Sequence, residues 1–143
     1  MAIAVVGMLD EREEGLQLIK DHIEKRGHRS VLIDISIGTG AIDSSLKPDI
    51  DCHAVAKSGG TTIEKVREML VKERDKATTM MADGLAKILQ EHHHAGELQG
   101  IIAVGGMTGT FISLSAMKLL PFGVPKLLIS SVAAMPALSL IHI

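Results

Sequence analysis

Four short apolar runs alternate with segments of helical spacing, and this alternation constrains the fold more than any other feature of the sequence. The runs predict buried strands at residues 2–6, 31–35, 101–104 and 126–129. The segments between them carry apolar residues at intervals of three and four, which is typical of helices that pack on a sheet. Strands that alternate with helices predict a doubly wound, Rossmann-like α/β domain with a parallel sheet and helices on both faces.

Capping and helix-breaking residues predict where the helices begin and end. Asp10 is expected to cap a first helix, which Gly27 ends. A long loop is expected over residues 36–51, and long loops in compact domains are often functional. Further helices are expected at residues 61–93, with a break near Thr78 and Thr79, and at residues 110–120.

Composition gives no support to several classes of function. The net charge is -2 without long runs of one sign, and Trp and Tyr are absent, so nothing in the sequence indicates nucleic-acid binding. No apolar run approaches the roughly 20 residues that cross a bilayer, and the single cysteine, Cys52, suits a reducing cytoplasm. We therefore expect a cytoplasmic domain at residues 1–134. Residues 135–143 carry no acidic or basic side chain and resemble translated adapter sequence, so we expect a truncated or non-native tail.

The sharpest local signal is the turn GGMTGT that follows the third predicted strand. Gly105, Gly106 and Gly109 allow positive φ angles and close approach of the backbone to an anion. Thr108 and Thr110 add hydroxyl donors, and the start of the next helix adds partial positive charge. The turn therefore predicts a phosphate-binding site. The sequence leaves open the alternative that the glycines only form a tight strand-to-helix turn.

Two other loops are expected at the same edge of the sheet, where ligands of doubly wound folds bind. In the loop that follows Gly7, Asp10 could bind a ribose hydroxyl or a phosphate-bound metal, and Arg12 could pair with phosphate. Asp10 could equally be only a helix cap. Ser130 and Ser131 end the fourth predicted strand and should face the ligand as well.

Three other patterns are weaker candidates. The run Ser58 to Thr62 could bind an anion, but helix capping by Ser58 or Thr61 is the favoured interpretation. Consecutive histidines at 92–94 cannot all face one metal ion on a helix, so no metal site is expected there. Cys52 and His53 lack an acid partner at a readable spacing, which disfavours a Cys–His nucleophile.

The segment from Gly100 to Ala133 resembles the ATP-binding amino-terminal domain family of the tomato mosaic virus resistance protein and its bacterial relatives. That family has a strand, a GG-x-x-GT turn, a helix with Met, and LPxGVPK before the next strand. The opening strand followed by Gly7, Leu9 and Asp10 also matches, with Arg12 in place of Lys. The other matching residues are Asp34, Pro48, Asp49, Ile50, Gly105, Gly106, Gly109, Thr110, Ala116, Met117, Leu120, Pro121, Gly123, Val124, Pro125, Lys126 and Ser130.

The resemblance implies a nucleotide-binding domain that holds ATP, with or without Mg²⁺, and whose phosphates lie at residues 105–110. It also implies a second α/β domain in full-length relatives, and we expect homo-oligomers. The alternative function is an enzyme domain that acts on a phosphorylated or carboxylate metabolite, with Asp10 as acid or base. The sequence identifies no catalytic residue.

Overall fold

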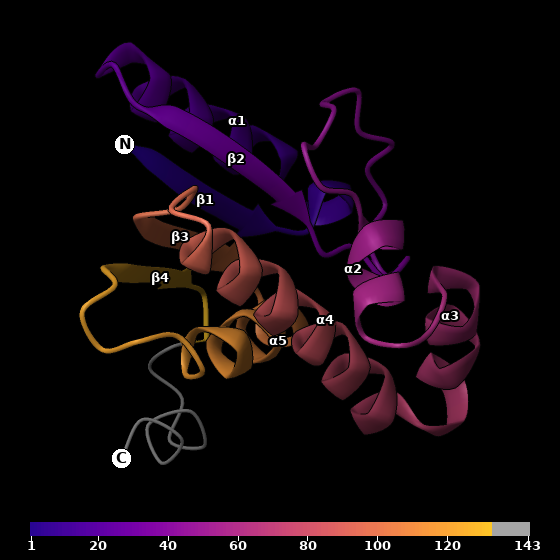
Figure 1. The fold of residues 1–143 in the computed structure, drawn as a ribbon. Helices are drawn as coiled ribbons and strands as arrows, with labels where there is room; N and C mark the ends of the chain where they lie inside the picture. The colour runs from indigo at the N-terminus through magenta and orange to yellow at the C-terminus, as the bar shows by residue number, and fades with distance from the viewer. Residues whose placement is uncertain (133–143) are drawn as a thin grey trace.

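The fold is a four-stranded parallel sheet with helices on both faces, as the sequence predicts (Figure 1). The computed structural model describes residues 1–132. The strands are β1 (Ala2–Gly7), β2 (Arg29–Asp34), β3 (Gly100–Gly105) and β4 (Lys126–Ser130), in the spatial order β2-β1-β3-β4. The chain moves from β1 to one side and then to the other, so the strand order reverses between β1 and β3. Ligands of open α/β sheets bind at such a reversal.

The described residues form five helices, and three of them begin at the carboxyl edge of the sheet. The helices are α1 (Leu9–Lys25), α2 (Cys52–Ser58), α3 (Ile63–Lys72), α4 (Arg74–His94) and α5 (Met107–Met117). The helix α1 lies on one face, while α4 and α5 lie side by side on the other (Figure 1). Because α1 and α5 follow parallel strands and α4 leads back to the start of β3, the N-termini of all three point to the carboxyl edge. No helix in the described part of the chain is long and apolar enough to span a membrane.

Several predicted boundaries were wrong. The helix α5 begins at Met107 rather than at 110, so most of the GGMTGT segment is helical. Asp10 lies in the first turn of α1, and Met8 occupies the capping position. The predicted helix over 61–93 is broken at Glu73 rather than near Thr78. The short helix α2 was not predicted. The predicted tail at 135–143 lies outside the described residues.

The backbones of α2 and α4 meet at two glycines. A Cβ on Gly84 would lie 2.0 Å from the carbonyl oxygen of Val55, and one on Gly59 would lie 2.1 Å from that of Met80. Only glycine allows so close an approach. This contact holds α4 closely against α2.

The two edges of the sheet differ. Along the outer edge of β2, Ile50 forms a parallel bridge with Ile33, and the Asp34 N–H donates to the carbonyl of Ile50 (2.9 Å). No described strand pairs with the outer edge of β4. On the face that carries α1, the side chains of Leu127 and Ile129 remain exposed, because among the described elements α1 packs against β1, β2 and β3 but not β4.

Candidate functional site

The candidate site is the turn between β3 and α5. Gly105 is buried at the end of β3, and a Cβ there would lie 2.8 Å from the Gly109 carbonyl carbon and from the Thr110 nitrogen. A side chain at position 105 would therefore push α5 away from the strand. None of the three turn glycines has a positive φ angle. That part of the prediction was wrong, and close packing explains the glycine at 105.

The N-terminus of α5 carries no side-chain cap. Its capping residue is Gly106, and the first backbone hydrogen bond runs from Thr110 N–H to the Gly106 carbonyl (3.0 Å). The N–H groups of residues 107–109 precede that bond and, as at any helix start, have no partner within the helix. They are donors at the positive end of the helix dipole, which is the arrangement that binds anions.

Arg12 lies directly beside this turn. A Cβ built on Gly106 would be 3.2 Å from Nη2 of Arg12 and 4.0 Å from Oγ of Ser131. Arg12 reaches this position from the first turns of α1, where its backbone departs from helical geometry (φ -127°, ψ 29°). The structure thus brings Arg12, Gly106 and Ser131 together, as the sequence predicted for one ligand edge.

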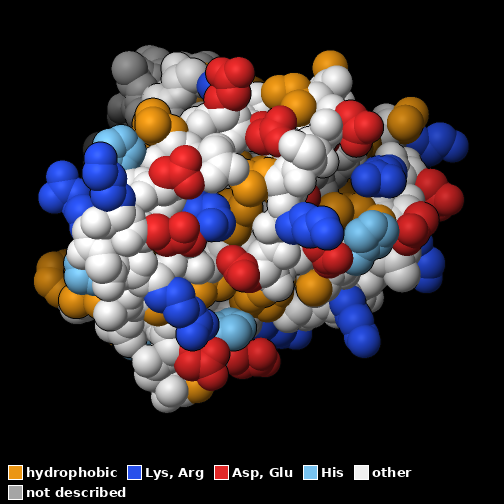
Figure 2. Space-filling view, turned by 90° about the horizontal axis from the view of Figure 1, so that it is seen from above, with side chains coloured by type: hydrophobic (Ala, Val, Ile, Leu, Met, Phe, Trp, Pro, Cys, Tyr) orange, Lys and Arg blue, Asp and Glu red, His pale blue; other side chains and the backbone are white. Residues whose placement is uncertain are grey.

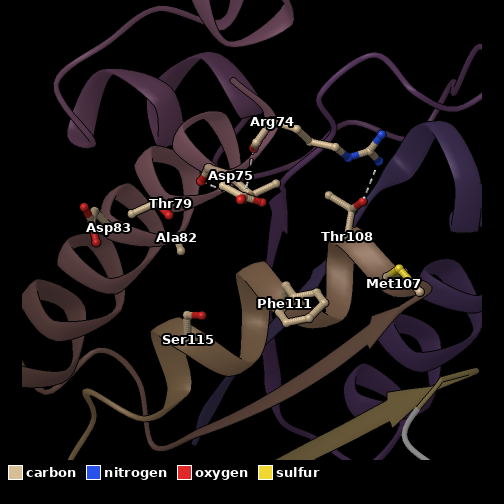
Figure 3. Close-up of a pocket in the computed structure, with 10 residues that line it drawn as sticks. Arg74, Asp75, Thr79, Ala82, Asp83, Met107, Thr108, Phe111 and Ser115 are labelled. Carbon is tan, nitrogen blue, oxygen red and sulfur yellow. Dashed lines mark hydrogen bonds between the residues drawn. The ribbon is translucent and has the colours of Figure 1, made fainter. Parts of the chain in front are cut away.

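A second arginine lies on the other side of the turn, and the sequence did not indicate it. Nη2 of Arg74 donates a hydrogen bond to Oγ1 of Thr108 (3.0 Å; Figure 3). Arg74 is separated from Thr108 by 34 residues, and only the parallel packing of α4 on α5 brings the two together. On the face shown in Figure 2, acidic and basic side chains are interspersed.

Thr110 and Ser130 lie beneath the turn. Thr110 is fully buried, and its Oγ1 lies 2.6 Å from Oγ of Ser130. The Ser131 N–H donates to the Gly105 carbonyl (3.3 Å). These contacts join the start of α5 to the end of β4. Thr110 and Ser130 thus hold the turn in place, and their binding to a ligand stays a prediction.

Asp10 belongs to a different network. Its Oδ2 accepts from the Gly40 N–H (3.2 Å), its own N–H donates to Oγ of Ser36 (3.2 Å), and its Oδ1 is buried without a hydrogen-bond partner. Asp34 accepts from the N–H groups of Leu9 (3.2 Å) and Ser36 (2.9 Å). The two carboxylates therefore fix the loop after β2 against the start of α1.

The remaining candidates have structural roles. A Cβ on Gly7 would lie 2.8 Å from the Leu16 side chain, so this glycine allows α1 to pack on the sheet. Thr62, rather than Ser58 or Thr61, caps α3 by accepting from the Lys65 N–H (3.3 Å). Cys52 is buried, which raises the pKa of its thiol to about 11. Among the described residues no cluster of three or more His, Cys, Asp or Glu could hold a metal ion.

Comparison with protein families identifies the chain. Residues 1–141 match the N-terminal domain of the uncharacterised protein family UPF0261. The chain belongs to this family. It is 36% identical over 134 residues to a UPF0261 protein of Clostridium tetani, and 32% identical over 131 residues to one of Brucella suis. Each comparison covers 92% of this chain but only 31% and 30% of those two relatives, respectively.

A more distant relative is the ToMV resistance protein Tm-1 of Solanum lycopersicum. This UPF0261 domain is 23% identical to it over 146 residues, which cover 90% of the chain and 18% of the tomato protein. The resemblance to the family of the tomato protein and its bacterial relatives is therefore confirmed, and ATP binding stays a prediction. The UPF0261 chain spans less than a third of the length of these relatives, so the activity of a whole relative is not assigned to it.

Proposed function

We propose that this UPF0261 domain binds a nucleotide, ATP in the first instance, with its phosphates at the N-terminus of α5. One observation carries the proposal: the Arg12 guanidinium lies beside Gly106, at an uncapped helix start. A guanidinium offers planar donors that match phosphate oxygens, and the helix start offers backbone donors and partial positive charge. Together they favour a phosphate group over a neutral ligand.

The position of the site supports the same function. The turn lies where the strand order reverses between β1 and β3, and α1, α4 and α5 direct their N-termini toward this edge. Ser131 is exposed beside Gly106, and Thr108 is half-buried and already oriented by Arg74. A phosphate chain would meet donors from three separate elements. Nucleotides in doubly wound folds bind at this kind of crevice.

The enzyme alternative receives less support from the structure. It required Asp10 as acid or base, but the Oδ1 of Asp10 is buried and the Oδ2 accepts a backbone N–H. A general acid or base must reach the proton that it transfers. The geometry therefore favours a structural role for Asp10, in which it holds Gly40 and the loop around it against α1.

Titration calorimetry with matched arginine variants tests the proposed function. Arg12→Gln removes the guanidinium beside Gly106, whereas Arg29→Gln makes the same change at the amino edge, on the first residue of β2. We expect wild type and Arg29→Gln to bind ATP equally, and Arg12→Gln to bind at least tenfold more weakly, because a hydrogen bond to a charged group contributes about 1.5–3 kcal/mol. An equal loss of ATP affinity in both variants, or the absence of ATP binding by the wild type, would contradict the proposal.

We further propose that a second domain of the longer proteins covers the open half of the sheet. Leu127 and Ile129 are 53% and 47% exposed, and the neighbouring Ile102 and Val104 are only partly buried. A contiguous exposed apolar face on a sheet is typical of an interface. The full-length relative from C. tetani should therefore protect this face. Limited proteolysis and hydrogen exchange across β4 would show whether it does.

A further inference from the structure

A groove runs between α4 and α5, starting at the candidate phosphate site. Its volume is about 640 Å³, within the range of small-molecule sites. Arg74 and Thr108 lie at one end and Ser115 toward the other (Figure 3). Ser115 is seven residues beyond Thr108, which corresponds to about 10 Å along a helix axis. The groove is therefore long enough to hold a sugar and a ring attached to a phosphate at the helix start.

The α5 wall of the groove carries two exposed apolar side chains besides the polar Thr108 and Ser115. Met107 and Phe111 line it, and they are 52% and 38% exposed. Phe111 is one of only two aromatic residues in a chain without Trp or Tyr. An exposed aromatic ring at a groove provides a surface on which a heterocyclic base can stack. Both side chains are therefore accessible to a ligand in the groove.

The α4 wall is polar and acidic. Asp75, Thr79 and Asp83 line it from successive turns. Carboxylates accept hydrogen bonds from hydroxyl and amino groups, which ribose and adenine carry, and they repel phosphate. The basic end of the groove is at Arg74, where the phosphates are proposed to lie. Asp75 lies next to Arg74 at that end, whereas Thr79 and Asp83 lie one and two turns further along α4, where they could accept hydrogen bonds from a sugar and a base.

From this arrangement we infer that the α4–α5 groove binds the nucleoside part of the nucleotide, with the base stacked on Phe111. The inference rests on the proposed function, because it starts from phosphates at the N-terminus of α5. It adds the part of the site that distinguishes ATP from inorganic phosphate chains. Phe111 would then select for a nucleotide, while Arg12 and the turn bind any phosphate chain.

Titration calorimetry with two ligands separates the inference from the proposed function. ATP and inorganic tripolyphosphate are titrated into the whole 143-residue chain, into Phe111→Leu and into Phe122→Leu. Phe111→Leu keeps an apolar side chain but removes the stacking surface. Phe122 is fully exposed and lies outside this groove, so Phe122→Leu is the matched control. Melting curves of each variant verify that the fold is intact.

We expect ATP to bind at least tenfold more tightly than tripolyphosphate. Phe111→Leu should weaken the binding of ATP by about tenfold, which is the order that base stacking contributes. The affinity for tripolyphosphate should not change. Phe122→Leu should change neither affinity. Equal affinities for the two ligands, or an unchanged ATP affinity in Phe111→Leu, would overturn the inference while the phosphate site stands. If wild type binds neither ligand, the proposed function and the inference both fail.

Discussion

The hydroxyl groups of Thr110 and Ser130 lie 2.6 Å apart and join the first turn of α5 to the end of β4. Because Thr110 is fully buried, loss of its hydroxyl leaves Ser130 without this partner. We expect Thr110→Ala to lower the free energy of unfolding by about 1–3 kcal/mol. Urea denaturation measures the loss. Thr110→Ser keeps the hydroxyl and should be closer to wild type, and an equal loss in both would show that the methyl group matters instead.

The turn glycines should respond differently to alanine. At Gly105 the new Cβ would lie 2.8 Å from helix backbone, whereas at Gly109 it would meet nothing within 4 Å. Gly105→Ala should therefore destabilise the protein by about 1–3 kcal/mol through overpacking. Gly109→Ala should be neutral or stabilising by up to about 1 kcal/mol, because alanine favours a helix. Thermal melting of the two variants would contradict this account if both lost stability equally.

Two helical glycines provide a similar contrast between propensity and packing. Gly84 in α4 touches the backbone of α2, while a Cβ on Gly15 in α1 meets nothing within 4 Å. Helix propensity alone predicts that alanine stabilises at both positions by about 1 kcal/mol. We expect that gain only for Gly15→Ala, and a clear loss for Gly84→Ala, because Cβ would lie 2.0 Å from a carbonyl oxygen. Chemical denaturation of the pair tests the α2–α4 contact.

The Glu13 carboxylate binds the loop after β2 to α1 by accepting hydrogen bonds from Ser45 and Leu46. Hydrogen bonds from Ser44, Ser45 and Leu46 hold the pKa of Glu13 below its usual value. A lowered pKa means that the contact is present at neutral pH and is lost as the pH falls through the folded-state value. Hydrogen exchange at the amide of Leu46 should therefore quicken, relative to intrinsic rates, in Glu13→Ala at pH 7. Exchange as slow as in wild type would show that other contacts hold the loop.

Cys52 should be unreactive while the protein is folded. Burial, and then the charge of Asp34, raise its pKa from 9.0 to about 11, so the thiol keeps its proton at pH 8. Alkylation by iodoacetamide at pH 8 should be slow in buffer and fast in urea. Because the thiol ionises at a lower pH in the unfolded chain, the free energy of unfolding should fall as the pH rises from 9 toward 11. Fast labelling of the folded chain would contradict the burial of this side chain.

The sheet was predictable because its strands are short, buried apolar runs. Each predicted strand differs from the observed one by at most two residues at either end. The start of α5 was not predictable in the same way, because glycine and threonine at 105–110 are poor helix formers and no side chain caps the helix. Packing of α5 on β3 and α4 overrides that preference. The seven residues of α2 are too few to show a helical period.

The candidate site was predictable only in part. The loops that follow parallel strands meet at one edge, so Arg12, Gly106 and Ser131 could be grouped from the sequence. Arg74 could not be grouped with them, because it begins a helix that follows no strand. The break before this helix, at Glu73, lies in a charged stretch without a glycine or proline. The hydroxyls of Thr110 and Ser130 were assigned to a ligand because the sequence does not show that they face each other.

The bridge between Ile33 and Ile50 closes part of the outer edge of β2 to further strands. On the β2 side, residues 49 and 50 already bond to the Leu32 carbonyl and to the Asp34 N–H. The longer free edge for a further strand therefore lies beside β4, with which no second described strand pairs. At the carboxyl edge of the sheet, that strand would lie beside Ser130, the last residue of β4. If that strand ran parallel, the loop after it would emerge next to Ser131, so each extension of the sheet would also enlarge the rim of the ligand crevice.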